Sequence, residues 1–169
     1  FFLVEPSEIY AEQIREYRQD FLDTNCSMDG CGPLRKCEDP FTYISECEKC
    51  TAQDTLPEGL VIATQFFYVR KADNRLVGMI QVRHYFNDYL SKFGGHIGYS
   101  IRPSERRKGY ATSMLNAILP YCREIGLDKL LITCIDGNIG SEKTIRNNGG
   151  VYESTVYESG KNCSLKRFW

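Results

Sequence analysis

Two kinds of hydrophobic spacing alternate along this 169-residue chain, and they predict the order of its helices and strands. Apolar residues three or four positions apart mark one face of a helix, as in the segment that Ser7 would cap and in the long segment after Lys108. The first face consists of Tyr10, Ile14, Tyr17 and Phe21, and the second of Ala111, Met114, Leu115, Ile118, Cys122 and Ile125. Asp39-Pro40 predicts a further helix through about Cys50, with an N-cap followed by a first-turn proline.

Shorter apolar runs predict the strands, and Asp73-Asn74 predicts the turn of a hairpin. Before the long helix, Ile97, Tyr99 and Ile101 alternate with residues that point to the opposite face. Strands are predicted at 1–4, 64–70, 75–83, 95–101, 129–134, 151–158 and 163–169, and a short helix at 138–148. This order predicts an α/β fold of the α+β type, with a central, mixed, mostly antiparallel sheet flanked by helices.

Composition and charge exclude some classes of protein. The formal net charge is −1, so the chain lacks the basic field that sequence-independent nucleic-acid binding requires. No apolar run approaches the ~20 residues that span a bilayer, and the opening Phe1-Phe2-Leu3-Val4 is shorter than the apolar region of a signal peptide. We therefore expect one cytoplasmic domain over residues 1–169 that binds neither nucleic acid nor membrane.

Five of the eight cysteines fall in a segment at about 24–51, which we interpret as a cysteine-rich insertion. Cys47-x-x-Cys50 has the spacing of a metal-ligand pair and suggests a zinc-dependent interaction domain as one hypothesis. It is a single pair on a predicted helix, and the other cysteine spacings are irregular, so reduced thiols without a metal are the simpler interpretation.

The segment from Ile101 to Thr112 has the pattern of an anion site, because a strand ends, a short turn follows and a helix begins. The first amides of a helix lack intrahelical partners and, together with the helix dipole, bind anions. Gly109 and Ala111 are small enough for a phosphate to approach, and Arg106-Arg107-Lys108 adds positive charge. The sequence has neither a P-loop nor a Gly-x-Gly-x-x-Gly pattern. The alternative is a solvated basic turn before an amphipathic helix.

Arg106-x-x-Gly109-x-Ala111 resembles the acyl-CoA pyrophosphate motif of the GNAT superfamily of N-acetyltransferases. The resemblance covers roughly Arg75 to Glu158, since Gly98–Pro103, Leu130–Cys134 and Asn138-x-x-Ser141 are similar to the family's neighbouring elements in the same order. It implies acetyl-CoA as cosubstrate and an amine of a small molecule or protein as acceptor. It also implies that the strand ending at Ile101 splays away from the strand at 129–134 in a V.

The resemblance also implies which residues bind the cosubstrate. The pantetheine arm would lie in the V against the backbone near Ser100 and Ile101, and the amides of 107–112 would hold the pyrophosphate. Asn138 and Ser141 would contact the pantetheine. The expected cofactor-binding residues are Ser100, Ile101, Arg106, Arg107, Lys108, Gly109, Tyr110, Ala111, Thr112, Asn138 and Ser141.

Catalysis by direct attack requires a neutral amine and a proton for the leaving thiolate. The tyrosine that many members of the family use as the acid corresponds here to Ile145. His96 is the first candidate base, because an imidazole titrates near neutrality, and Tyr99 is the second. The alternatives are a structural histidine and a core tyrosine. Two functions remain in view: an N-acetyltransferase of primary amines, or a CoA-binding regulatory or sensor module. A homodimer is compatible with either.

Overall fold

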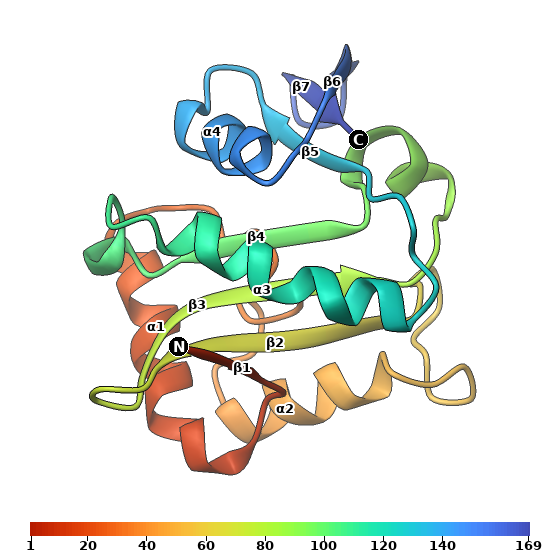
Figure 1. Ribbon diagram of the computed structural model, residues 1–169. Coiled ribbons are helices and arrows are strands. Elements are labelled where there is room, and N and C mark those ends of the chain that lie inside the picture. Colours follow the sequence, from red (N-terminus) through yellow and green to blue (C-terminus); the bar gives the residue numbers. More distant parts are fainter.

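The fold is organised around a seven-stranded sheet, seen in a computed structural model that describes residues 1–169 (Figure 1). The strands are β1 (Phe2–Val4), β2 (Ala63–Arg70), β3 (Arg75–Arg83), β4 (Ile97–Ile101), β5 (Ile132–Ile135), β6 (Tyr152–Glu158) and β7 (Cys163–Phe168). The α-helices are α1 (Ala11–Asp23), α2 (Pro40–Lys49), α3 (Tyr110–Glu124) and α4 (Ile139–Asn147). Short helical turns are η1 (Glu8–Tyr10), η2 (Leu90–Gly94) and η3 (Pro103–Glu105).

The sheet has the order β1-β2-β3-β4-β5-β7-β6 and is antiparallel except between β4 and β5. These two strands share a single ladder pair, Ile97 with Ile132, whereas β3 and β4 share five. Beyond that pair β4 and β5 diverge, and Figure 1 shows the C-terminal arm of β5, α4, β6 and β7 standing apart from the rest. The predicted mixed, mostly antiparallel sheet with a splayed centre is confirmed.

Helices cover both faces of this sheet, and each face has its own core. Every residue on the predicted face of the first helix is buried with β2 and β3, together with α2. On the other face, Met114, Leu115, Ile118 and Cys122 of α3 are buried against β2 to β5. None of the helices is both long and apolar enough to cross a membrane.

Most predicted boundaries agree with the structure to within about two residues, and the two larger differences, at the starts of α1 and β5, have local causes. The Asp39 cap is confirmed, since its Oδ2 accepts a hydrogen bond from the Thr42 amide at 2.8 Å. The prediction that Ser7 caps the first helix is wrong, because the Ser7 side chain makes no capping hydrogen bond and a 3₁₀ turn precedes α1. The strand predicted at 129–134 begins only at Ile132, because the Leu131 amide donates to a histidine ring and not to a neighbouring strand.

The cysteine-rich segment packs against the α1 face of β4. Gly30 lies directly on Gly98, and its carbonyl accepts a hydrogen bond from Gln65 at 2.9 Å. Cys31 is fully buried, with its sulfur 3.0 Å from the Ser100 hydroxyl. No group of three or more His, Cys, Asp or Glu side chains could hold a metal ion, so the zinc hypothesis gains no support.

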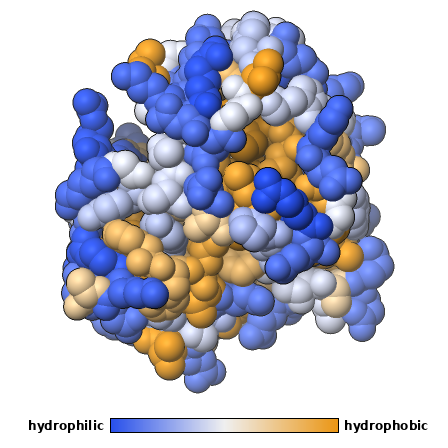
Figure 2. Space-filling model, in the orientation of Figure 1, coloured by the Kyte–Doolittle hydropathy of each residue, from blue (hydrophilic) through white to orange (hydrophobic).

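An apolar crevice of about 720 Å³ opens on the other face, between α3 and the C-terminal arm. Figure 2 shows its apolar side chains gathered in a hollow. Its walls include Leu119 and Leu130 on one side and Ile145 and Phe168 on the other. None of the residues expected to bind acetyl-CoA lines it, so we do not assign it to the cosubstrate.

The contact between Gly30 and Gly98 predicts a large cost for any side chain at Gly30. A Cβ there would lie 2.1 Å from the Gly98 carbonyl carbon, whereas one at Gly59, with a similar φ, would meet nothing within 4 Å. We expect Gly30→Ala to lower the free energy of unfolding by about 2 kcal/mol more than Gly59→Ala, since overpacking adds to the shared backbone strain. Urea denaturation of both variants measures this difference, and equal losses would contradict the packing described.

Candidate functional site

The opening between β4 and β5 leaves one edge of β4 without a strand partner. Two backbone hydrogen bonds set the β3–β4 register. The Arg83 amide donates to the His96 carbonyl, and the Arg102 amide donates to the Val77 carbonyl. Alternation along an antiparallel pair then directs the backbone groups of Ser100 toward β3 and those of Tyr99 and Ile101 toward the opening. The backbone groups that face the V are therefore those of Tyr99 and Ile101, not those of Ser100. Of these, the Ile101 carbonyl already accepts a hydrogen bond from the Arg106 side chain, which leaves the Tyr99 groups and the Ile101 amide for a ligand.

His96 lies at the closed end of the V and joins its two arms. Its amide donates to the Leu131 carbonyl at 2.7 Å, and its Nδ1 accepts from the Leu131 amide at 2.9 Å. Burial, and then the charge of Arg83, lowers the pKa of His96 to about 4. With Nδ1 occupied and the pKa so low, this imidazole has the geometry of a structural link between strands and is a weak candidate for the base.

Tyr99 crosses from β4 to α4, on the face of the sheet opposite α1. Its hydroxyl lies 2.8 Å from the Ser141 hydroxyl and 3.3 Å from the Ser141 carbonyl. Burial raises the pKa of Tyr99 to about 12, although the hydrogen bond with Ser141 opposes this. Tyr99 therefore keeps its proton at neutral pH and is chemically a donor, not the base suggested by the sequence.

The turn from Arg106 to Gly109 leads into α3 through two left-handed residues. Arg107 has φ 65° and Gly109 has φ 79°, and the space beside the Gly109 Cα is open. No side chain caps the first turn of α3, where Tyr110, Ala111 and Thr112 lie. Free helix-start amides beside an open glycine suit the oxygens of a phosphate.

The three basic residues of this turn have different surroundings. Arg106 folds back, with its Nε donating to the Ile101 carbonyl at 3.1 Å and its guanidinium over the Phe21 ring. Lys108 donates to Glu105 at 2.8 Å. Arg107 is exposed and has no ion-pair partner within 4 Å. The predicted basic rim therefore consists chiefly of Arg107, while Arg106 shapes the turn.

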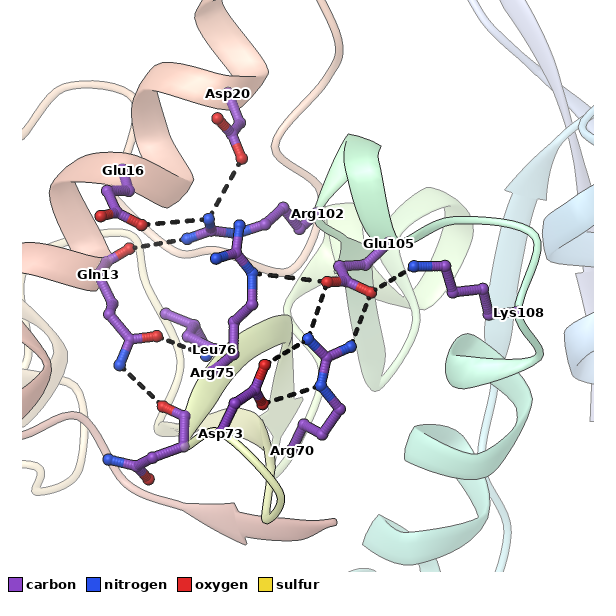
Figure 3. A network of polar contacts seen from close by, with 11 residues as sticks. Gln13, Glu16, Asp20, Arg70, Asp73, Arg75, Leu76, Arg102, Glu105 and Lys108 are labelled. Atoms are coloured by element: carbon purple, nitrogen blue, oxygen red, sulfur yellow. Dashed lines mark hydrogen bonds and ion pairs between the residues drawn. The ribbon is translucent and has the colours of Figure 1, made fainter.

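Glu105 anchors the turn to the β2–β3 hairpin, as Figure 3 shows. Its buried carboxylate accepts from Arg70 at 2.9 and 3.2 Å and lies 3.5 Å from Arg75. Burial alone would raise the pKa of Glu105, but the hydrogen bonds from Lys108 and Arg70 outweigh it and hold that pKa below its usual value. The sequence did not indicate this role, because Arg70 and Arg75, which tie Glu105 to the hairpin, lie 30 or more positions away along the chain.

Arg102 fixes the other end of the turn to α1 (Figure 3). Its side chain is 1% exposed, and its guanidinium lies 3.3 Å from Glu16 and 3.4 Å from Asp20. It also packs over the Tyr17 ring, 5.6 Å from the centroid. Together, Arg102 and Glu105 hold the start of α3 from both sides.

Asn138 and Ile145 belong to the structure of α4. The Asn138 side chain accepts a hydrogen bond from the Ser141 amide at 3.1 Å and caps the helix. Ile145 is 1% exposed within the core, so no hydroxyl is presented at that position. The structure thus brings together Tyr99, Ile101 and Ser141 at the V and the 106–112 turn near its mouth.

Comparison with known proteins agrees with this geometry. Residues 33–151 match the family model described as the acetyltransferase (GNAT) domain. The chain therefore belongs to the GNAT family of acetyltransferase domains.

Individual relatives are more distant. An uncharacterized N-acetyltransferase of Bacillus subtilis, YnaD, is 30% identical over 88 residues, which are 52% of this chain and about half (49%) of that relative. A ribosomal L7/L12 α-N-protein acetyltransferase, RimL, in complex with coenzyme A has a TM-score of 0.69 at 13% identity, covering 98% of this chain and 90% of that one. A spermidine N-acetyltransferase of Vibrio cholerae, SpeG, has a TM-score of 0.63 at 17% identity, covering 99% and 93%.

The position of His96 predicts a pH dependence of stability. Its pKa in the folded state is lowered, so between its unfolded and folded pKa values the unfolded chain binds more protons and stability falls as the pH falls. We expect wild type to lose about 2 kcal/mol relative to His96→Asn from about pH 7.5 to about pH 5. The asparagine oxygen can still accept the Leu131 amide but does not titrate. Urea denaturation of both proteins checks this, and parallel pH profiles would refute it.

Proposed function

We propose that this protein is an N-acetyltransferase that transfers an acetyl group from acetyl-CoA to a primary amine by direct attack. The observation that carries the proposal is the opening between β4 and β5, which share the single pair Ile97–Ile132, with the uncapped start of α3 near its mouth. Membership of the GNAT family supports it. The three relatives named above are acetyltransferases, so they do not support the alternative of a regulatory module.

In this proposal the amides of 107–112 bind the pyrophosphate of acetyl-CoA. Arg107 adds charge, and the turn held by Arg106 and Lys108 sets the position of the amides. The pantetheine arm lies along the free edge of β4, at Tyr99 and Ile101, with α4 and its Asn138 cap on the other side. An extended arm on a strand edge satisfies backbone groups as an added strand does.

The chemical step joins the amine nitrogen to the acetyl carbon and breaks the carbon–sulfur bond. An amine that arrives as an ammonium first gives one proton to solvent water, and its nitrogen gives a second one to water as the new bond forms, while the departing thiolate gains a proton. We assign the proton that the thiolate gains to the hydroxyl pair of Tyr99 and Ser141, which spans the V and remains protonated at neutral pH. Ile145 occupies the position of the family's usual tyrosine acid, and in this proposal the Tyr99–Ser141 pair supplies the proton instead.

We also expect the protein to act in the cytoplasm.

The pyrophosphate assignment predicts that a negative charge at Gly109 prevents acetyl-CoA binding. Gly126, at the other end of α3, has a similar φ of 83° and equally open space, so Gly126→Asp is a matched control. We expect Gly109→Asp to weaken acetyl-CoA binding by about 100-fold or more, through charge repulsion, while Gly126→Asp binds as wild type does. Isothermal titration calorimetry gives both affinities. Similar affinities in the two variants would exclude this site.

The proton assignment predicts that Tyr99→Phe lowers kcat by about 100-fold without weakening acetyl-CoA binding. Tyr68→Phe is the matched control, because the buried Tyr68 hydroxyl also donates to a serine, Ser113, at 3.0 Å but lies away from the V. Thiol release from acetyl-CoA with a primary amine measures kcat. Equal kcat values in the two variants would remove Tyr99 from the mechanism.

A further inference from the structure

A cluster of polar groups lies on the face of the sheet opposite α3 and α4, which is the face that the proposed function leaves open to an acceptor. On this face Thr133 of β5 donates to the Phe93 carbonyl, and Arg167 of β7 donates to the Ser91 carbonyl, both at 2.7 Å. Lys166, which alternates with Arg167, instead contacts Glu142 of α4. Segment 85–94 therefore covers the β5–β7–β6 arm on this side.

Glu158, the last residue of β6, faces this segment, and only one of its two carboxylate oxygens accepts a hydrogen bond. Its Oε1 accepts a hydrogen bond from the Tyr89 hydroxyl at 2.8 Å. Its Oε2 is buried and has no hydrogen-bond partner, and the residue is only 5% exposed. A buried carboxylate oxygen without a donor is unfavourable, so this atom is suited to accept hydrogen bonds from a ligand.

Lys161 places an ammonium group at the rim of this cluster. Its Nζ donates to the Tyr89 hydroxyl at 2.7 Å and lies 5.4 Å from the centre of the Tyr89 ring. It is 3.8 Å from Glu158 Oε2, an ion-pair distance too long for a hydrogen bond. The side chain is 66% exposed and belongs to the turn between β6 and β7, so it can move away without disturbing either strand.

We propose that Tyr89 and Glu158 form the binding site for the ammonium end of the acceptor. In the free protein the ammonium of Lys161 occupies this site, and the acceptor displaces it. The inference rests on the proposed function and specifies its substrate class as an unhindered primary alkylammonium. The Tyr89 hydroxyl oxygen and the free carboxylate oxygen of Glu158 accept the protons of the cation, as the Tyr89 hydroxyl already does for Lys161. A lysine ammonium already lies here, so a ligand end of the same shape fits the same space.

The test measures binding of n-butylammonium to the CoA-loaded protein by NMR titration. We expect Glu158→Gln to weaken this binding by about tenfold, because a charge-assisted hydrogen bond is lost. Lys161→Met removes the competing ammonium and tightens binding severalfold. Lys71→Met, in the β2–β3 turn, is the control for loss of a surface lysine and leaves the affinity unchanged.

The outcomes separate this inference from the proposed function. If acetyl-CoA does not bind wild type, the proposed function fails. If acetyl-CoA binds but n-butylammonium does not, or if it binds equally to wild type, Glu158→Gln and Lys161→Met, the ammonium site is refuted while the proposed function stands. Because Lys161 is exposed, we expect Lys161→Met to retain the fold. The Lys161→Met titration therefore tests the site even if Glu158→Gln does not fold. Thiol release with n-butylamine and with a blocked lysine peptide then distinguishes a small-molecule acceptor from a protein side chain.

Discussion

The separation of β4 from β5 is the constraint on which the rest of the molecule depends. Two neighbouring strands that fail to pair leave backbone groups unsatisfied, so the structure must hold them apart at a cost. The two hydrogen bonds between His96 and Leu131 close the V at one end, and the Tyr99–Ser141 contact spans it further along. A ligand that supplies hydrogen bonds along the free edge of β4 would complete the sheet, so the opening itself favours an extended ligand.

A second requirement is that the start of α3 stays fixed relative to this opening. The turn before α3 contains left-handed residues and a glycine, which alone would leave it mobile. Buried charges compensate for this, because Arg102 binds α1 and Glu105 binds the β2–β3 hairpin. Breaking either pair would leave an uncompensated buried charge. The rigid half of the sheet thus sets the position of the helix-start amides.

The sequence predicted the elements of this fold better than it predicted the roles of its polar residues. Periodicity located the buried face of α1 and the alternation along β4, because both are local consequences of backbone geometry. It could not show that His96 would bind a backbone amide 35 residues away, or that Lys108 would pair with Glu105. A basic run looks the same in sequence whether its charges face a ligand or a neighbouring carboxylate. The Tyr89–Glu158 contact carries no local signal either, since its two residues lie 69 positions apart.

The two faces of the opening also differ in charge, and this difference gives the site a direction. On the α3 side, helix-start amides and Arg107 favour an anion. On the other side, the free oxygen of Glu158 favours a cation, and the ammonium of Lys161 is already close to it. An anionic cosubstrate and a cationic acceptor would therefore approach from opposite faces and meet where β4 and β5 diverge. The same separation of β4 from β5 would thus admit both ligands, one from each face of the sheet.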